Sequence, residues 1–173
     1  MKINIDTCRR WIYKYIGENM LKIGESFVFE DDWSQRRSSF MYFEGDETET
    51  PSWSVDIGFA AGDFHGQKIS PSICINPIDT DKRSATDLAG ESFSVMTMEE
   101  SLDREDSFYI YEHEPLVDYQ LKIIEIRTNK AHIKCSGTLI VDGYAQPYAK
   151  EKFEIDSWIP IIQSATDWEK FGL

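Results

Sequence analysis

The fold is decided by residues 119–160, which read YQLKIIEIRTNKAHIKCSGTLIVDGYAQPYAKEKFEIDSWIP. A tight turn at Asn129 and the hairpin dipeptide Asp142-Gly143 interrupt this meander, so we expect three antiparallel strands, over Tyr119–Thr128, Lys130–Val141 and Tyr148–Asp156. In the middle strand the residues alternate between two faces, one with Ala131, Ile133, Cys135, Leu139 and Val141 and the other with His132, Lys134, Ser136 and Thr138. This period of two predicts a sheet with one buried and one solvated face.

Further strands and two helices are expected outside the meander. Alternating aromatic and branched residues predict strands over 25–30, 38–44, 52–59, 69–76, 91–98 and 108–113. A helix is predicted near the N-terminus, where Cys8, Trp11, Ile12, Tyr15 and Ile16 recur at helical spacing, and Ser164 with Asp167 predicts a capped terminal turn. The predicted fold class is α+β, with a mainly antiparallel sheet curled into a half-barrel or sandwich, the N-terminal helix packed on it and a short C-terminal helix.

Length and composition indicate one domain with a hydrophobic core. The chain has 173 residues, is 41% hydrophobic and contains 10 Phe, 8 Tyr and 5 Trp. No apolar run approaches the roughly 18 residues that a membrane span needs, and the first residues lack a secretory signal, so a cytoplasmic location is expected. The three cysteines are far apart and form no Cys-x-x-Cys pair, so we expect neither a disulfide framework nor a metal site, and no cofactor.

The charge of the chain is unevenly distributed. The formal net charge is -13, because 31 acidic residues stand against 18 Lys and Arg. Residues 25–63 hold ten acids and two bases, residues 79–118 hold twelve acids and three bases, and residues 119–173 hold seven of each. The balance argues against nucleic-acid binding, which needs Lys and Arg to neutralise phosphates, and it favours a basic protein partner. The meander, being neutral, is interpreted as scaffold.

Known catalytic motifs do not fit the sequence. The segment His113-Glu114-Pro115-Leu116-Val117 begins like a zinc-protease motif, but a valine replaces the second histidine and a proline interrupts the required helix. No phosphate-binding glycine loop or dinucleotide fingerprint is present. His65 and Asp63 share a glycine-rich loop, which leaves a hydrolase as an alternative, although no nucleophile accompanies them. We therefore expect a protein that is not an enzyme.

Aromatic residues interleave with acidic residues in both charged blocks, and tyrosine beside charge is typical of protein interfaces. We predict a partner-binding surface with Tyr42, Tyr109 and Tyr111 as anchors and Glu44, Asp46, Glu47, Glu49, Glu99, Glu100, Asp103, Glu105, Asp106 and Glu112 as charged contacts. Acidic loops also serve solubility, so a surface that is merely solvated stays an alternative.

In this general build, a compact β-rich domain with acidic, aromatic-flanked blocks and no enzyme motif, the chain resembles the small acidic immunity proteins of bacterial toxin systems, including contact-dependent growth inhibition. The resemblance implies a protein inhibitor that neutralises a basic toxin, with a nuclease as the leading case, by occupying the cleft meant for phosphates. A β-barrel-like protein that binds a small apolar ligand is the alternative of a different class, since the aromatic residues would also line a cavity.

Overall fold

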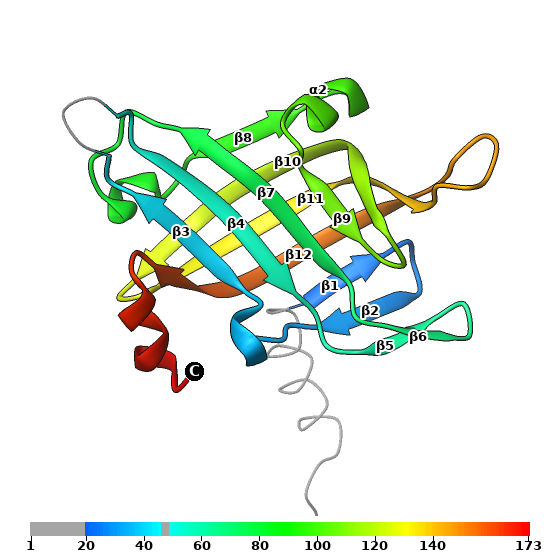
Figure 1. Cartoon of the computed structure of the whole chain (residues 1–173), viewed down its shortest axis with the longest axis horizontal. Coiled ribbons are helices and arrows are strands. Elements are labelled where there is room, and N and C mark those ends of the chain that lie inside the picture. Colours follow the sequence, from blue (N-terminus) through cyan, green and yellow to red (C-terminus); the bar gives the residue numbers. More distant parts are fainter. Residues whose placement is uncertain (1–19, 46–48) are drawn as a thin grey trace, which may run out of the picture.

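The computed structural model describes residues 20–45 and 49–173. Within them the chain is mostly β-structure, arranged as a closed barrel with short flanking elements (Figure 1). The helix predicted around residues 8–16 lies outside the described residues.

The three strands of the meander are confirmed, and each is longer than predicted at one end. They are β10 (His113–Arg127), β11 (Lys130–Asp142) and β12 (Ala149–Ile162). The middle strand alternates as expected, because Ala131, Ile133, Cys135 and Leu139 are buried while Lys134 and Ser136 are exposed. The register places Leu121 opposite Cys135 and Cys135 opposite Ile155, which gives one continuous apolar inner face.

Four further strands continue the sheet beyond β10, in the order β9 (Ser107–Tyr109), β7 (Ser72–Asp79), β4 (Ser52–Gly58) and β3 (Ser39–Phe43). The last residues of β12 then pair in parallel with β3, at Ile161 opposite Phe40 and Ile162 opposite Met41. This pairing closes a barrel of seven strands. The predicted α+β class, with an open half-barrel or a sandwich carrying a packed helix, is therefore wrong, since the sheet closes on itself and its core lies inside the barrel.

Short elements extend the barrel. The strand β1 (Met20–Ile23) pairs with β12 and β2 (Phe27–Glu30) pairs with β1. The strand β8 (Ser92–Val95) pairs with β10, and β5 (Gly62–Phe64) and β6 (Gln67–Ile69) form a separate hairpin. The helical turns are η1 (Ser34–Arg36), η2 (Ala85–Leu88), α2 (Met98–Asp103) and η3 (Ala165–Phe171). At η3 the carboxylate of Asp167 accepts hydrogen bonds from the N–H groups of Gln163 and Ser164, which is the contribution predicted for this acid.

The barrel interior is filled by side chains. Phe40 stacks on Trp53 with ring centroids 5.6 Å apart, and Phe108 meets Phe153 at 5.7 Å. Barrels with about eight strands have interiors just wide enough for side chains to fill, and the buried aromatic rings occupy that space here.

Candidate functional site

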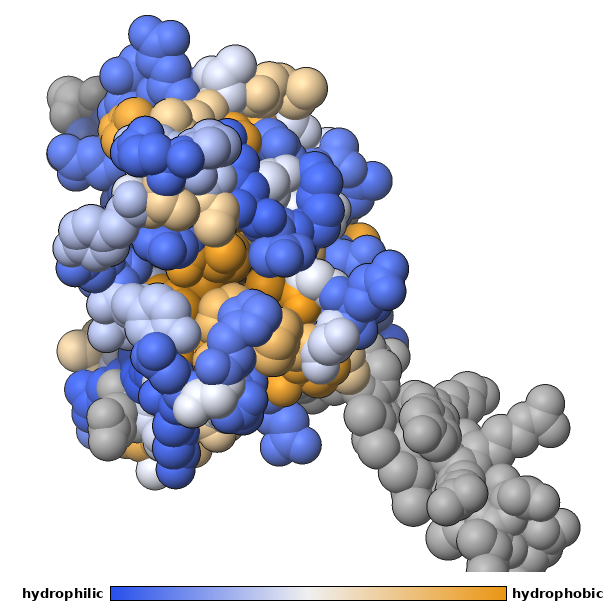
Figure 2. All heavy atoms as spheres, turned by 90° about the vertical axis from the view of Figure 1, so that its right-hand side faces the viewer, coloured by the Kyte–Doolittle hydropathy of each residue, from blue (hydrophilic) through white to orange (hydrophobic). Residues whose placement is uncertain are grey.

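The candidate site lies at one end of the barrel, on the right of Figure 1, where the β9–β10 connection (110–112) meets the β11–β12 connection (143–148). We call this end the barrel mouth. The two connections enclose a hollow of about 40 Å³, the mouth hollow, lined by Ile110, Tyr111, Glu112, Glu114, Ile140, Val141, Asp142, Gly143 and Tyr144. Figure 2 views the molecule from this side and shows apolar surface in its centre, enclosed by hydrophilic residues.

The connection after β11 is held in shape by Asp142. Its Oδ1 accepts hydrogen bonds from the N–H groups of Tyr144 (2.9 Å) and Ala145 (3.3 Å), an arrangement typical of Asx turns. The turn therefore spans more residues than the two-residue hairpin that the dipeptide Asp142-Gly143 suggests. It presents Tyr144 with 79% of its surface exposed, and the Tyr144 hydroxyl donates to Oε1 of Glu112 at 2.7 Å.

Glu114 reaches the hollow because residue 143 is glycine. In the β9–β10 register Glu114 stands opposite Phe108, which is buried inside the barrel, so the Glu114 side chain lies on the inner face at the mouth. A Cβ atom on Gly143 would lie 1.8 Å from Oε1 of Glu114. Any other residue at position 143 would therefore displace this carboxylate.

The mouth carries uncompensated negative charge. Glu112, by hydrogen bond and by charge, raises the pKa of the Tyr144 hydroxyl, and the nearby charges of Glu114 and Asp142 act in the same direction. In the part of the chain that the structure describes, none of these three acids forms an ion pair with Lys or Arg. A cation from outside is the natural complement of this arrangement.

Further aromatic side chains surround the mouth. Tyr111 and Tyr148 are 43% and 41% exposed. On the β5–β6 hairpin, the ring of His65 packs against Phe64 with centroids 4.6 Å apart, and Phe64 in turn lies 6.4 Å from Tyr111. The mouth thus combines exposed tyrosines, an apolar floor and carboxylates, the composition that protein interfaces use for anchors.

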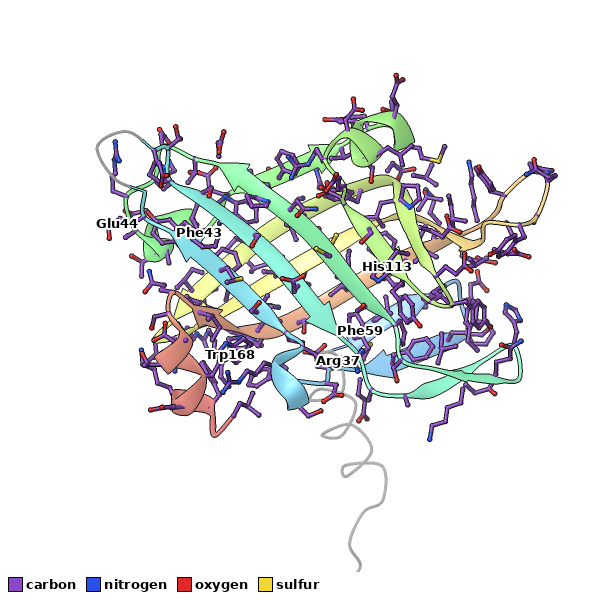
Figure 3. The ribbon with its side chains drawn as sticks, in the orientation of Figure 1. Arg37, Phe43, Glu44, Phe59, His113 and Trp168 are labelled. Carbon is purple, nitrogen blue, oxygen red and sulfur yellow. The ribbon has the colours of Figure 1, made fainter. Side chains whose placement is uncertain are left out.

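The structure separates the predicted contact residues into three places. Tyr109, Tyr111 and Glu112 lie at the mouth, where the ring of His113, labelled in Figure 3, packs at a tilt against Tyr109 with centroids 5.1 Å apart. Glu44 and Glu49 flank the β3–β4 connection at the opposite end of the barrel, and Asp46 and Glu47 fall outside the described residues. Glu99, Glu100, Asp103 and Glu105 lie on and just after α2.

The prediction of a partner contact is wrong for two residues, because both are buried. Tyr42 is only 3% exposed, because it points inward from β3, and its hydroxyl donates to the backbone oxygen of Lys82 at 3.0 Å. Asp106 is 1% exposed and accepts hydrogen bonds from the Tyr119 hydroxyl (2.6 Å) and Arg104 Nε (2.8 Å). It also accepts one from the N–H of Asn76. Neither side chain is available to a partner.

Part of the second acidic block serves the helix α2. Thr97 caps it by accepting from the N–H of Glu100 (3.2 Å), while Oε2 of Glu100 accepts from the N–H of Met96 (3.0 Å). Glu99 and Glu100 occupy the first turn, where negative charge interacts favourably with the helix dipole. Glu99 and Glu100, which the sequence predicts as partner contacts, therefore have a local structural role at the start of α2.

A second hollow, of about 590 Å³, lies on the outer face of the meander under β8. Its polar side chains form a cross-strand row in which Ser94, Gln120, Ser136 and Glu154 stand opposite one another. Two acids of this face have partners. Asp156 contacts His132 Nε2 at 2.6 Å and Lys134 Nζ at 2.8 Å, and Asp118 accepts from Thr138 at 2.8 Å. Because Lys134 and Lys152 lie beside these acids, the charge of this face is mixed.

The hydrolase alternative receives no support from His65 and Asp63. The Asp63 carboxylate accepts from the N–H of Gly66 at 3.3 Å and so closes the β5–β6 turn, while the His65 ring packs on Phe27 and Phe64. Among the described residues, no group of three or more His, Cys, Asp or Glu is arranged to hold a metal ion.

Comparison with known protein families, with curated proteins and with solved structures gives no match, so the functional argument rests on the geometry of the mouth.

Proposed function

We propose that this protein is an inhibitor of the immunity type, which binds a basic toxin, with a nuclease as the leading case, at the barrel mouth. It acts by binding and not by catalysis. The observation that carries the proposal is the set of three carboxylates, Glu112, Glu114 and Asp142, which have no cationic partner among the described residues and lie beside exposed tyrosines.

The two kinds of residue at the mouth have separate tasks in such a complex. Unmatched carboxylates attract a basic surface over a distance and accelerate association, an effect that weakens as salt is added. Tyr111 and Tyr144 offer large rigid rings that lose little conformational entropy on binding, and so they slow dissociation.

The alternative of a small apolar ligand is less well supported. Ligand pockets commonly enclose about 300–1,000 Å³, and the mouth hollow is far smaller at about 40 Å³. The aromatic rings that would line a cavity instead pack against one another inside the barrel.

The proposed place of action is the cytoplasm. No helix in the described part of the chain is long and apolar enough to cross a membrane. Burial raises the pKa of the Cys135 thiol and also raises that of Cys74, to about 12, so both thiols stay protonated and unreactive. Free, inert thiols are consistent with a reducing compartment.

The test compares charge reversal at the mouth with charge reversal elsewhere. The variant E112K/E114K and the control D103K/E169K change the net charge equally, and the control residues are exposed and lie on α2 and η3. Proteins that the wild type captures from host lysate are purified, tested for toxicity on their own, and titrated against each variant.

We expect at least one captured basic protein to be toxic alone and to be neutralised by the wild type and the control. Affinity for E112K/E114K should fall by roughly 100-fold or more, since reversal replaces attraction with repulsion. Equal binding of both variants would show that the mouth is not the interface. A captured protein without toxicity would contradict the immunity role.

A further inference from the structure

The size of the mouth hollow limits what can enter it. About 40 Å³ exceeds what one water molecule needs and falls far below the volume of an ordinary ligand pocket. Ile110, Ile140 and Val141 form the aliphatic part of the lining of the hollow. These dimensions fit the end of a single side chain from a partner.

The walls of the hollow select for a cation with an apolar stem. Its floor is aliphatic, which suits the methylene groups of a long side chain. Tyr111 and Tyr144 also line the hollow, and aromatic rings attract cations placed over their faces. Glu112, the last residue of the β9–β10 connection, and Glu114, on β10, both line the hollow, so a planar group with several N–H donors can satisfy both carboxylates.

We infer that the mouth hollow is the binding site for one arginine side chain of the basic partner. This inference rests on the proposed function and makes it specific. The guanidinium group would lie between Glu112 and Glu114 and stack against tyrosine, while its stem covers the aliphatic floor. Lysine would fit less well, because its point charge cannot contact both carboxylates with a rigid fork of donors.

The geometry at Gly143 supplies a precise variant for testing this site. A Cβ atom there would lie 1.8 Å from Oε1 of Glu114 and 2.6 Å from its carboxyl carbon, so G143A must displace that carboxylate from the hollow. The substitution leaves every charge in place. It therefore tests the shape of the site separately from its electrostatics.

The experiment is an NMR titration of the full chain with acetyl-Gly-Arg-Gly-amide and with the citrulline peptide, which has nearly the same shape but no charge. We expect shifts of the amide signals of Gly143 and Tyr144 with a Kd in the range of about 1–10 mM, as for other single-contact ligands. The citrulline peptide, the G143A variant and the E114Q variant should each weaken binding at least about tenfold. Signal dispersion and thermal unfolding of the variants show that they fold.

Several outcomes would overturn the inference. These are an equal response to arginine and citrulline, unchanged binding by G143A, shifts centred on α2 instead of the mouth, or no localised shift at about 10 mM peptide. If these appear while E112K/E114K still loses the protein partner, only the arginine site fails. If E112K/E114K keeps the partner, the proposed function fails whatever the peptide does.

Discussion

The barrel mouth and the outer face of the meander both carry acidic residues, but they differ in what those residues touch. On the outer face, Asp156 contacts His132 and Lys134 within 2.8 Å, so its charge is largely compensated inside the protein. At the mouth, Glu112 meets a tyrosine hydroxyl and Asp142 meets backbone N–H groups. The difference leads us to expect that an acid contributes to recognition only where the fold leaves it without a cation, whatever the charge of its sequence segment.

Compared with these acids, Asp106 has the most fully compensated charge, through an ion pair and hydrogen bonds inside the protein. It is buried with three hydrogen-bond donors around it, from Tyr119, Arg104 and Asn76. Asp31 is the opposite case, since its carboxylate is largely removed from solvent and its Oδ1 has no hydrogen-bond partner within the described residues. Together with the mouth and the outer face, these residues form a series that can be tested by removing one carboxylate at a time.

The largest effect is expected for D106A. Removing this carboxylate leaves the Tyr119 hydroxyl and the Arg104 guanidinium without their buried partner, which should reduce the free energy of unfolding by about 3–5 kcal/mol. Urea unfolding of D106A and of the wild type measures this difference in the free energy of unfolding. D103A, at an exposed position of the same segment, should change stability by less than about 0.5 kcal/mol. If D106A and D103A lowered the free energy of unfolding by similar amounts, the buried hydrogen bonds of Asp106 would not contribute specially to stability.

The next effect has the opposite sign and concerns Asp31. Burial raises the pKa of this carboxyl to about 6, while a hydrogen bond from Ser157 partly opposes the rise. Between pH 4 and 6 the folded protein holds a proton that the unfolded chain has released, so stability falls as pH rises through this window. The full penalty of about 3 kcal/mol is reduced by partial exposure, to about 1–2 kcal/mol.

D31N should therefore be more stable than the wild type by about 1–2 kcal/mol at pH 7 and equal to it near pH 4. Unfolding free energies at both pH values check this. A variant that is less stable at pH 7 would show that the ionised carboxylate is favourable where it lies, and Asp31 would then belong with the compensated acids.

A smaller loss is expected for D156N on the outer face. The variant weakens contacts to His132 and Lys134, which are partly exposed, and should cost about 0.5–1 kcal/mol. The measurement is best made in the D31N background, because Asp156 also repels Asp31 and that repulsion hides part of the loss. An unchanged unfolding free energy there would mean that the outer-face pairs do not compensate the charge.

The smallest effect on stability is expected for E112Q at the mouth. The amide oxygen can still accept from Tyr144, and no ion pair to Lys or Arg is lost within the described part of the chain. The free energy of unfolding should stay within about 0.5 kcal/mol of the wild type. If E112Q lowered the free energy of unfolding as much as D156N does, the mouth and the outer face would not differ in how their acids contribute to stability.

The sequence predicts most of the strands, but it misses the closure of the sheet and the break at 110–112, inside the strand predicted over 108–113. Alternation over residues 131–139 is a local signal, and it correctly predicts the strand and its buried face; beyond it Ile140 is buried and Val141 only half-buried, where the register with β12 shifts. The pairing that closes the barrel joins Ile161 to Phe40, residues too distant in sequence for any local pattern to connect. Pro160 also argues against a strand at that point, because proline cannot donate to a neighbouring strand.

Some residues of the mouth can be predicted from the sequence and others cannot, again because local patterns do not show which segments meet in the fold. Interleaving of acids with aromatics selects Tyr109, Tyr111 and Glu112 within one segment. Glu114 and Tyr144 come from different hairpins, and only the register of β10 with β11, which places Leu116 opposite Leu139, brings their connections together. Extending the predicted meander by a few residues would have indicated this neighbourhood. Tyr42 was misassigned because an alternating strand does not say which of its faces is inside.

The parallel pairing of β12 with β3 also has a consequence for biosynthesis. During translation β3 is made well before β12, so the edge of β3 at Phe40 and Met41 stays open until Ile161 and Ile162 have left the ribosome. An unpaired strand edge is a template for aggregation. The nascent chain therefore exposes an unpaired edge throughout this interval. A truncated product that lacks these two residues would keep the edge of β3 open.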